Sequence, residues 1–215
     1  ASADGRQTMV GIVRRVSEQV FIPLTVGGGI RSADDMGRML EEAADKVSVN
    51  TAAINDPGLI ERCARQFGAQ CVVLAIDVQR VEHPVRMAMQ GEPGQLGEAP
   101  WQVYTHGGRR PTALDPVKWS RLGAGLGAGE ILVTSMNTDG QRGGYDLPLL
   151  AAISEAVTVP VVASGGAGRV EHMYDALVTG KADAVLAASI FHFGDIRISE
   201  VKAYLAERGV PVRPL

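Results

Sequence analysis

The chain has 215 residues, of which 46% are hydrophobic and 21% charged, as is typical of one globular domain with a substantial core. Its net charge of −3 and its pI near 5.8 argue against a nucleic-acid or membrane-surface partner. The longest apolar runs have the length of strands, so we expect no transmembrane helix, and the two cysteines, Cys63 and Cys71, predict reduced core residues of a cytoplasmic protein.

Strand-like and helix-like hydrophobic spacings alternate along the chain. We expect strands at Ile22–Val26, Lys46–Asn50, Cys71–Ile76, Glu130–Ser135, Val159–Ala163 and Ala184–Ala188. We expect helices at Thr8–Val20, after Ser32, after Asp56-Pro57, from Asp115 to about Leu122, and at Leu147–Val157, Arg169–Thr179 and Ile198–Arg208. Nearly continuous apolar strands between amphipathic helices require a parallel sheet covered by helices. The predicted fold is an α/β protein of the (β/α)8-barrel type with about six parallel strands.

The segment Val81–Gly108 interrupts this alternation. Val85–Met89 and Trp101–Tyr104 have the pattern of two hairpin arms, and Gly91–Pro100, with three glycines and two prolines, has the composition of a tip. We therefore expect a single barrel-type domain over residues 1–215 with a hairpin insertion at about 81–108.

A glycine-rich turn follows the predicted strand Val159–Ala163. Ser164 opens into Gly165-Gly166-Ala167-Gly168, and a helical pattern begins at Arg169. Glycines at such a turn let a phosphate approach the backbone N–H groups, because no Cβ blocks the way. A tight turn between strand and helix, without a ligand, is an equally good interpretation.

The same pattern occurs earlier in the chain. Pro23–Ile30 also contains an apolar strand followed by three glycines, and Gly29 lies 137 residues before Gly166. The following strand repeats as well, because Thr51 lies 138 residues before Ser189. Two successive elements repeated at nearly one offset predict two related halves, each with its own candidate phosphate turn.

One carboxylate and several small polar residues follow the predicted strands, at the end where (β/α)8 barrels place their chemistry. Asp77 closes the most apolar strand, where partial desolvation suits a general acid or base, although a simple cap is the alternative. Thr134 and Ser135 end another strand, and we expect both side chains to point into the same barrel mouth.

Other polar pairs have two interpretations. Asn50-Thr51 and Ala188-Ser189 can donate hydrogen bonds to a phosphate or simply cap a helix. Asp139-Gly140 follows the strand Glu130–Ser135, and such a pair is usually a turn. The four histidines lack the spacing of metal ligands, so we expect no metal, and we expect no cofactor. The charged residues Lys46 and Glu130 begin strands and are expected at the opposite face.

Eight short motifs, taken together, indicate a resemblance to one protein family. They are Thr25–Arg31, Asp45–Ala53, Ala75–Asp77, Tyr104–Gly108, Gly129–Ser135, Gly144–Asp146, Ala163–Gly168 and Ala187–Phe193. Over essentially the whole chain they closely resemble the cyclase subunit of imidazole glycerol phosphate synthase. The resemblance implies a (β/α)8 barrel of histidine biosynthesis that takes ammonia from a glutaminase partner and cyclises a linear bis-phosphate ribulosyl substrate.

The resemblance also assigns residues, motif by motif. Asp77 matches one of the family's two catalytic aspartates. One phosphate site matches Gly29, Asn50 and Thr51. The region of the other phosphate site matches Asp139, Gly140, Gly166, Ala188 and Ser189. Lys46 and Glu130 match charged residues at the ammonia entrance, which faces the glutaminase.

The sequence departs from the family pattern in three respects. The family's first catalytic aspartate and the lysine on the loop after it have no counterpart, and neither do the first strand, the first helix and the second strand. Asn137 stands where the family leads us to expect an aspartate, and the hairpin around Gly91–Pro100 is longer than usual. We therefore expect an N-terminally truncated cyclase with low or no activity.

The missing strands carry a further expectation. Ile22–Val26 and Ala184–Ala188 would become unpaired sheet edges, which recruit other chains, so we expect a homo-oligomer, most simply a two-fold dimer. One alternative is a non-catalytic barrel fragment that binds phosphate and self-assembles. Another is a different phosphosugar isomerase of the same superfamily, which we expect to differ at Tyr104–Gly108 and Ala187–Phe193.

Overall fold

The computed structural model describes residues 3–81 and 100–213. The chain forms two compact units, each of which combines two separate stretches of sequence. Unit 1 contains Ala1–Ala75 and Arg121–Ile131, and unit 2 contains Ile76–Ser120 and Leu132–Leu215. Each unit is described by itself.

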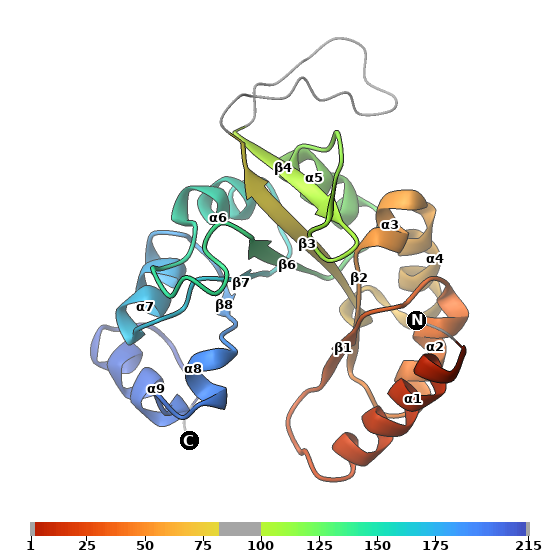
Figure 1. Cartoon of the computed structure of the whole chain (residues 1–215), viewed down its shortest axis with the longest axis horizontal. Coiled ribbons are helices and arrows are strands. Elements are labelled where there is room, and N and C mark those ends of the chain that lie inside the picture. Colours follow the sequence, from red (N-terminus) through yellow and green to blue (C-terminus); the bar gives the residue numbers. More distant parts are fainter. Residues whose placement is uncertain (1–2, 82–99, 214–215) are drawn as a thin grey trace. The chain divides into compact units, whose positions relative to one another are not determined.

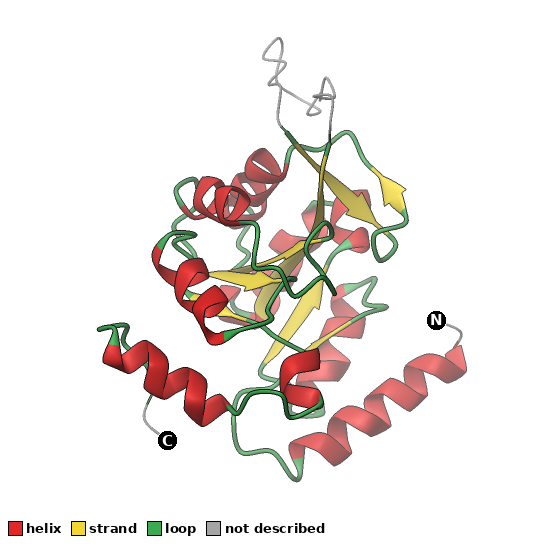
Figure 2. Ribbon diagram, turned by 60° about the vertical axis from the view of Figure 1, so that its left-hand side comes forward, coloured by secondary structure: helices red, strands yellow, loops and turns green. Residues whose placement is uncertain are grey.

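Helices alternate with strands along the described chain (Figures 1 and 2). The strands are β1 (Thr25–Gly27), β2 (Lys46–Val49), β3 (Val72–Arg80), β4 (Trp101–Thr105), β5 (Arg110–Pro111), β6 (Glu130–Ser135), β7 (Val161–Ser164) and β8 (Ala184–Val185). The helices are α1 (Ala3–Ser17), α2 (Ala33–Glu41), α3 (Thr51–Asn55), α4 (Gly58–Phe67), the 3₁₀ turn η1 (Ala69–Cys71), α5 (Pro116–Gly125), α6 (Leu147–Ser154), α7 (Val170–Val178), α8 (Ser189–His192) and α9 (Ile198–Glu207).

The predicted parallel α/β architecture with about six parallel strands is confirmed. The hydrogen-bonded path of strands is β1-β2-β3-β6-β7-β8, and β4 and β5 lie off this path. Unit 1 holds β1, β2 and the first residues of β3 and β6, and unit 2 holds the remainder. Among the described residues the path begins at β1 and ends at β8, the two strands that the sequence predicts as edges.

Unit 1 shows why its residues form these elements. In β2 the buried Val47 and Val49 alternate with the less buried Lys46 and Ser48, because successive side chains of a strand face opposite sides. In α4 the buried positions Leu59, Ile60 and Cys63 fall on one helical face. The start of α2 is also as predicted, because Ser32 Oγ accepts a hydrogen bond from Asp35 N at 3.1 Å.

The connection between α1 and β1 differs from the prediction. The helix ends at Ser17 rather than Val20, and the strand begins at Thr25 rather than Ile22. Pro23 has no N–H for a strand ladder. The N–H of the next residue, Leu24, donates to Asp45 Oδ2 at 2.7 Å. Ile22, which we expected inside a strand, is therefore 66% exposed in the connection.

In unit 2, the end of β3 differs from the prediction, and one arm of the predicted hairpin is a strand. The sequence predicted a strand that stops at Ile76, but β3 continues to Arg80 because β4 pairs with it in antiparallel register, from Asp77 opposite Tyr104 to Arg80 opposite Trp101. Trp101–Tyr104 is therefore a strand, as expected. The other expected arm, Val85–Met89, lies outside the described residues.

Two short elements, β8 and α3, also differ from the prediction. β8 contains only Ala184 and Val185, so the expected strand Ala184–Ala188 is too long, and the short helix α8 begins at Ser189. The sequence analysis also did not predict the short helix α3, which begins at Thr51.

In the part of the chain that the structure describes, no helix is both long enough and apolar enough to span a membrane.

Candidate functional site

Three loop segments of unit 2 make up its candidate site. They are residues 137–145 after β6, 165–168 after β7 and 186–189 after β8. These strands are neighbours in the order β6-β7-β8, and loops that follow neighbouring parallel strands leave the same edge of the sheet. The segments contain five of the residues that the sequence predicts for a phosphate site, namely Asp139, Gly140, Gly166, Ala188 and Ser189.

The glycine turn after β7 requires glycine at two positions. Gly165 and Gly166 have positive φ angles of 87° and 113°, which L side chains rarely adopt. A Cβ on Gly165 would lie 2.7 Å from the backbone oxygen of Ser135, and a Cβ on Gly166 would overlap the backbone oxygen of Gly144. The backbone of this turn is therefore in close contact with the loop after β6.

Three hydrogen bonds hold the turn in place. Gly144 N donates to Gly166 O at 2.9 Å, and Thr138 Oγ1 donates to Gly165 O at 3.0 Å. Gly168 N donates to Nδ1 of His172, a buried residue of α7, at 3.2 Å. The loop 137–145 and α7 thus both hold the turn in its conformation.

The loop 137–145 also reaches the third segment. Tyr145, which is 6% exposed, donates its phenolic O–H to Leu186 O at 2.9 Å, just before Ala188 and Ser189. Burial raises the pKa of Tyr145 well above its usual range, because the phenolate is poorly solvated there. Gly144 and Tyr145 are adjacent, so one short stretch positions both the glycine turn and the start of α8.

Asp77 lies within β3 rather than at its end. It belongs to the less buried series of that strand, between the buried Ile76 and Val78. In β6 the less buried series includes Thr134, whereas Ser135 is buried with Val133. The prediction that Thr134 and Ser135 point into one mouth is therefore wrong, because adjacent residues of a strand face opposite sides.

Ser135 nevertheless shapes the site through its backbone. Its carbonyl oxygen accepts a hydrogen bond from Asp139 N at 2.9 Å and lies 3.3 Å from Thr138 Oγ1, which shares its single proton between this oxygen and Gly165 O. These bonds form the turn at the start of the loop 137–145, so Asp139-Gly140 is part of a structured turn, as the sequence suggests.

The second candidate phosphate turn belongs to unit 1. Gly29 has a φ of 76°, and the register that pairs Gly27 with Ser48 brings the loops after β1 and β2 to one edge. Asn50 directly precedes α3, and Thr51 is its first residue. The sequence therefore placed Gly29, Asn50 and Thr51 on adjacent loops of a single unit, and the two candidate phosphate turns lie in different units.

Lys46 and Glu130 stand at the opposite ends of their strands. They are the first residues of β2 and β6, as predicted, and their side chains form an ion pair within unit 1. The Lys46 side chain is 33% exposed and that of Glu130 17%. The sequence placed both residues at this face but did not predict that they contact each other.

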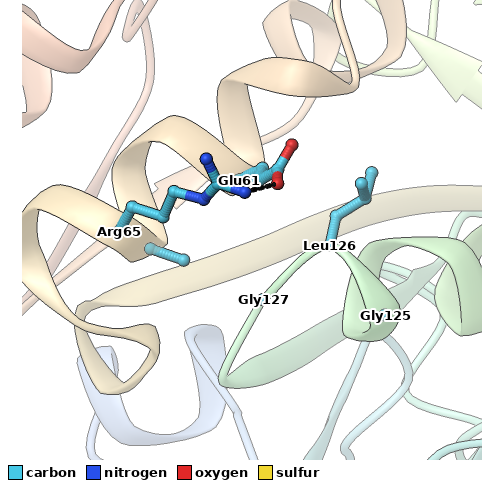
Figure 3. A pocket seen from close by; sticks show the side chains of 6 residues that line it. Glu61, Arg65, Gly125, Leu126 and Gly127 are labelled. Atoms are coloured by element: carbon cyan, nitrogen blue, oxygen red, sulfur yellow. Dashed lines mark hydrogen bonds and ion pairs between the residues drawn. The ribbon is translucent and has the colours of Figure 1, made fainter.

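Other features of the described residues carry no assignment. No group of three or more His, Cys, Asp or Glu side chains in the described ranges is arranged to hold a metal ion. A hollow of about 320 Å³ lies in unit 1 between α4 and the end of α5 (Figure 3). Arg65 and Glu61, which line it, pair with each other at 2.5 Å, and it contains none of the predicted site residues.

Four residues of the unit 2 site were missed as functional candidates: Thr138, Tyr145, Asp146 and His172. Gly144-Tyr145-Asp146 served above only as a motif of resemblance. The signal that could have found these residues is a buried phenol and a helix-capping Asp in a glycine-rich loop. The partners of Thr138 and Tyr145 lie 27 and 41 residues away, so those two contacts could not be read from the sequence, whereas Asp146 and His172 bond to residues three and four positions away.

The parallel strands, the helices between them and the polar loops after the strands define an α/β protein of the barrel type. The family model of histidine biosynthesis proteins matches residues 1–197. The chain therefore belongs to this family, whose members are isomerase-type or cyclase-type enzymes of histidine biosynthesis.

Proposed function

We propose that the chain is a cyclase-type protein of histidine biosynthesis, related to the cyclase subunit of imidazole glycerol phosphate synthase. The observation that carries this proposal is the pair of glycine turns, one in each unit, at Gly29 and Gly166. Each turn offers backbone N–H groups to a phosphate group, the resemblance implies a bis-phosphate ribulosyl substrate, and inorganic phosphate ions are the simplest substitutes.

Each site residue receives a role in this proposal. Asp77 is the general acid or base, because it is a half-exposed carboxylate on the less buried side of β3. In unit 2, backbone and hydroxyl donors bind one phosphate, and this set comprises Thr134, Asp139, Gly140, Gly166, Ala188 and Ser189, with Ser135 acting through its backbone. In unit 1, Gly29, Asn50 and Thr51 likewise bind a phosphate group.

The ion pair of Lys46 and Glu130 favours a cyclase over an isomerase of the same family. A cyclase needs an entrance for ammonia at the face where strands begin, and a paired lysine and glutamate at that face can gate it. Beside this pair, Lys46 N donates to Leu24 O at 3.2 Å, which links it to the connection from Val20 to Leu24. That connection lines a hollow of about 350 Å³ together with Ser17, Ala43 and Asp45, and Phe21 is 95% exposed there.

A glutaminase subunit is the partner that this face would receive. We expect a glutaminase to bind the chain, and Phe21→Ser to weaken that binding at least about tenfold, because a large exposed aromatic side chain is a typical binding hot spot. Val178→Ser, at an exposed apolar residue of α7 in unit 2, is the matched control and should leave binding unchanged. Isothermal titration calorimetry measures both, and equal affinities for the two variants would contradict this assignment.

The second candidate function is a non-catalytic barrel fragment that binds phosphate and self-assembles. It is favoured by the strand path, which begins at β1 and ends at β8 among the described residues, since unpaired strand edges bind further strands. Exposed apolar side chains also follow β8, including Leu186 and Phe193. We expect a homodimer in sedimentation experiments, and a stable folded monomer at micromolar concentration would contradict self-assembly.

An assay of ammonia-dependent cyclisation tests the main proposal. We expect slow turnover by this chain, because the resemblance provides two catalytic aspartates and only Asp77 has a counterpart here. Asp77→Asn should lower the remaining rate by about 10²–10⁴-fold. The control is Asp34→Asn on the exposed face of α2, which should change nothing. Turnover that is rapid and insensitive to Asp77→Asn would contradict the role of Asp77.

A further inference from the structure

The carboxylate of Asp146 collects donors from three different elements of unit 2. Its Oδ1 accepts a hydrogen bond from Leu149 N at 3.2 Å, which caps α6, and its Oδ2 accepts one from the indole Nε1 of Trp101 in β4 at 3.1 Å. Arg80, the last residue of β3, brings its Nη2 to 3.7 Å from Oδ1. The Asp146 side chain is only 8% exposed, so these contacts replace water around a buried charge.

Arg80 is tied to the same region in two further ways. Its backbone N–H donates to the side-chain Oδ1 of Asn137 at 2.7 Å. Its guanidinium lies over the Trp101 ring, 5.5 Å from the ring centroid. The end of the β3–β4 hairpin is therefore attached to both ends of the loop 137–145, at Asn137 and at Asp146.

These contacts connect the two parts of the proposed site in unit 2. On one side, Arg80 lies three residues after Asp77 on a strand whose register with β4 is continuous from Asp77 to Arg80. On the other side, the loop holds the glycine turn through Gly144 and the segment before Ser189 through Tyr145. The cap of α6 alone would not require this arrangement, because a cap uses only one carboxylate oxygen.

We propose that Asp146 is a positioning residue which, through Trp101 and Arg80, holds the β3–β4 hairpin with Asp77 in register with the loop that shapes the phosphate turn. This inference rests on the proposed phosphate site of unit 2. A phosphate bound at that turn should therefore change the surroundings of Trp101, although Trp101 does not belong to the phosphate site.

Tryptophan fluorescence can test this connection, because the chain contains two tryptophans, Trp101 and Trp119. Trp119 is buried, and its indole N–H has no hydrogen-bond partner among the described residues, so Trp119→Phe removes no hydrogen bond. In that variant, inorganic phosphate should change the emission of Trp101 along a saturating curve. Calorimetry should give the same dissociation constant. Trp101→Phe should abolish the fluorescence change.

A matched pair of substitutions then isolates the role of Asp146. Asp146→Asn keeps a cap for α6, but its amide group places N–H donors against the donors of Trp101 and Arg80. Glu155→Gln at the other end of α6 breaks an exposed ion pair with Lys181 and is the control. We expect Asp146→Asn to raise the dissociation constant of phosphate roughly three- to tenfold and to reduce the Trp101 signal, and Glu155→Gln to change neither.

The direction in which Asp146→Asn changes the affinity for phosphate distinguishes a positioning role of Asp146 from a purely electrostatic one. If Asp146 acted only as a negative charge near an anion, its neutralisation would tighten phosphate binding, and this outcome would overturn the proposal. If calorimetry shows no phosphate binding by the unsubstituted chain, the proposed phosphate site fails. Hydrogen exchange of residues 78–81 and 137–145 then decides the inference. Faster exchange in Asp146→Asn than in Glu155→Gln supports the connection, and equal exchange overturns it.

Discussion

The two glycine turns have similar sequences but different surroundings. The turn after β7 is buried at Gly165 and Gly166 and is held by the loop 137–145, whereas Gly27 at the end of β1 and Gly28 and Gly29 after it are exposed. A Cβ on Gly28 would meet no described heavy atom within 4 Å, while one on Gly166 would overlap the backbone of Gly144.

This difference shows that the backbone conformation of a glycine turn and the packing around that turn are separate properties. Both turns contain glycines with positive φ, so the local conformation follows from the local sequence. In unit 2 a second loop packs against the turn, and a turn held in this way binds a phosphate without first having to be ordered. We therefore expect phosphate to bind more tightly to unit 2 than to unit 1.

The largest expected effect comes from adding a methyl group to each turn. Gly166→Ala should lower the free energy of unfolding by at least about 3 kcal/mol, because a Cβ would combine a disfavoured φ with a backbone overlap. Gly28→Ala should cost only about 1–2 kcal/mol, from its positive φ alone. Urea denaturation measures both, and equal costs would contradict the difference in support.

The next effect concerns the phenol of Tyr145. Tyr145→Phe removes the hydrogen bond to the carbonyl of Leu186, so we expect a loss of about 0.5–1.5 kcal/mol in the free energy of unfolding, together with weaker phosphate binding. Tyr174→Phe is the control, because the Tyr174 ring packs edge-on against Tyr204 on α9. If both variants unfold at the same urea concentration, Tyr145 does not support the site as we propose.

The same residue predicts a dependence on pH. Burial raises the pKa of folded Tyr145, so above about pH 10 the unfolded chain loses the phenolic proton while the folded chain keeps it. This contribution to stability is therefore fully present below pH 10 and declines as the pH rises further. In alkaline denaturation, the slope of stability against pH should be shallower for Tyr145→Phe than for the unsubstituted chain, and identical slopes would contradict the prediction.

The smallest effect belongs to the strand starts of unit 1. Glu130→Gln removes the ion pair with Lys46, which is partly exposed, so it should cost about 1 kcal/mol or less. Salt should reduce the difference between the variant and the unsubstituted chain, because it screens such pairs. Thermal unfolding at low and high ionic strength measures this effect. A cost above that of Gly28→Ala would show that unit 1 depends more on this pair than on its turn.

Much of the fold and part of the candidate site could be predicted from the sequence. The alternating apolar segments predicted the parallel strands and the helices between them, because buried strands and helix faces leave periodic patterns. Ser32 marked a helix start correctly, since a cap bonds to a residue three positions away. The same reasoning misplaced Ser135, because it considered the end of the strand and ignored the alternation of its side chains.

The sequence by itself determined which turns contain glycine, where helices begin and which strands are buried, because these properties depend on neighbouring residues. The tertiary structure alone decided that Gly144 and Tyr145 brace two other segments, that β3 continues past Asp77 to pair with β4, and that Lys46 contacts Glu130. These partners are separated by 21 to 84 residues in the sequence. Such contacts arise only when the sheet brings distant strand ends together, and no local pattern records them.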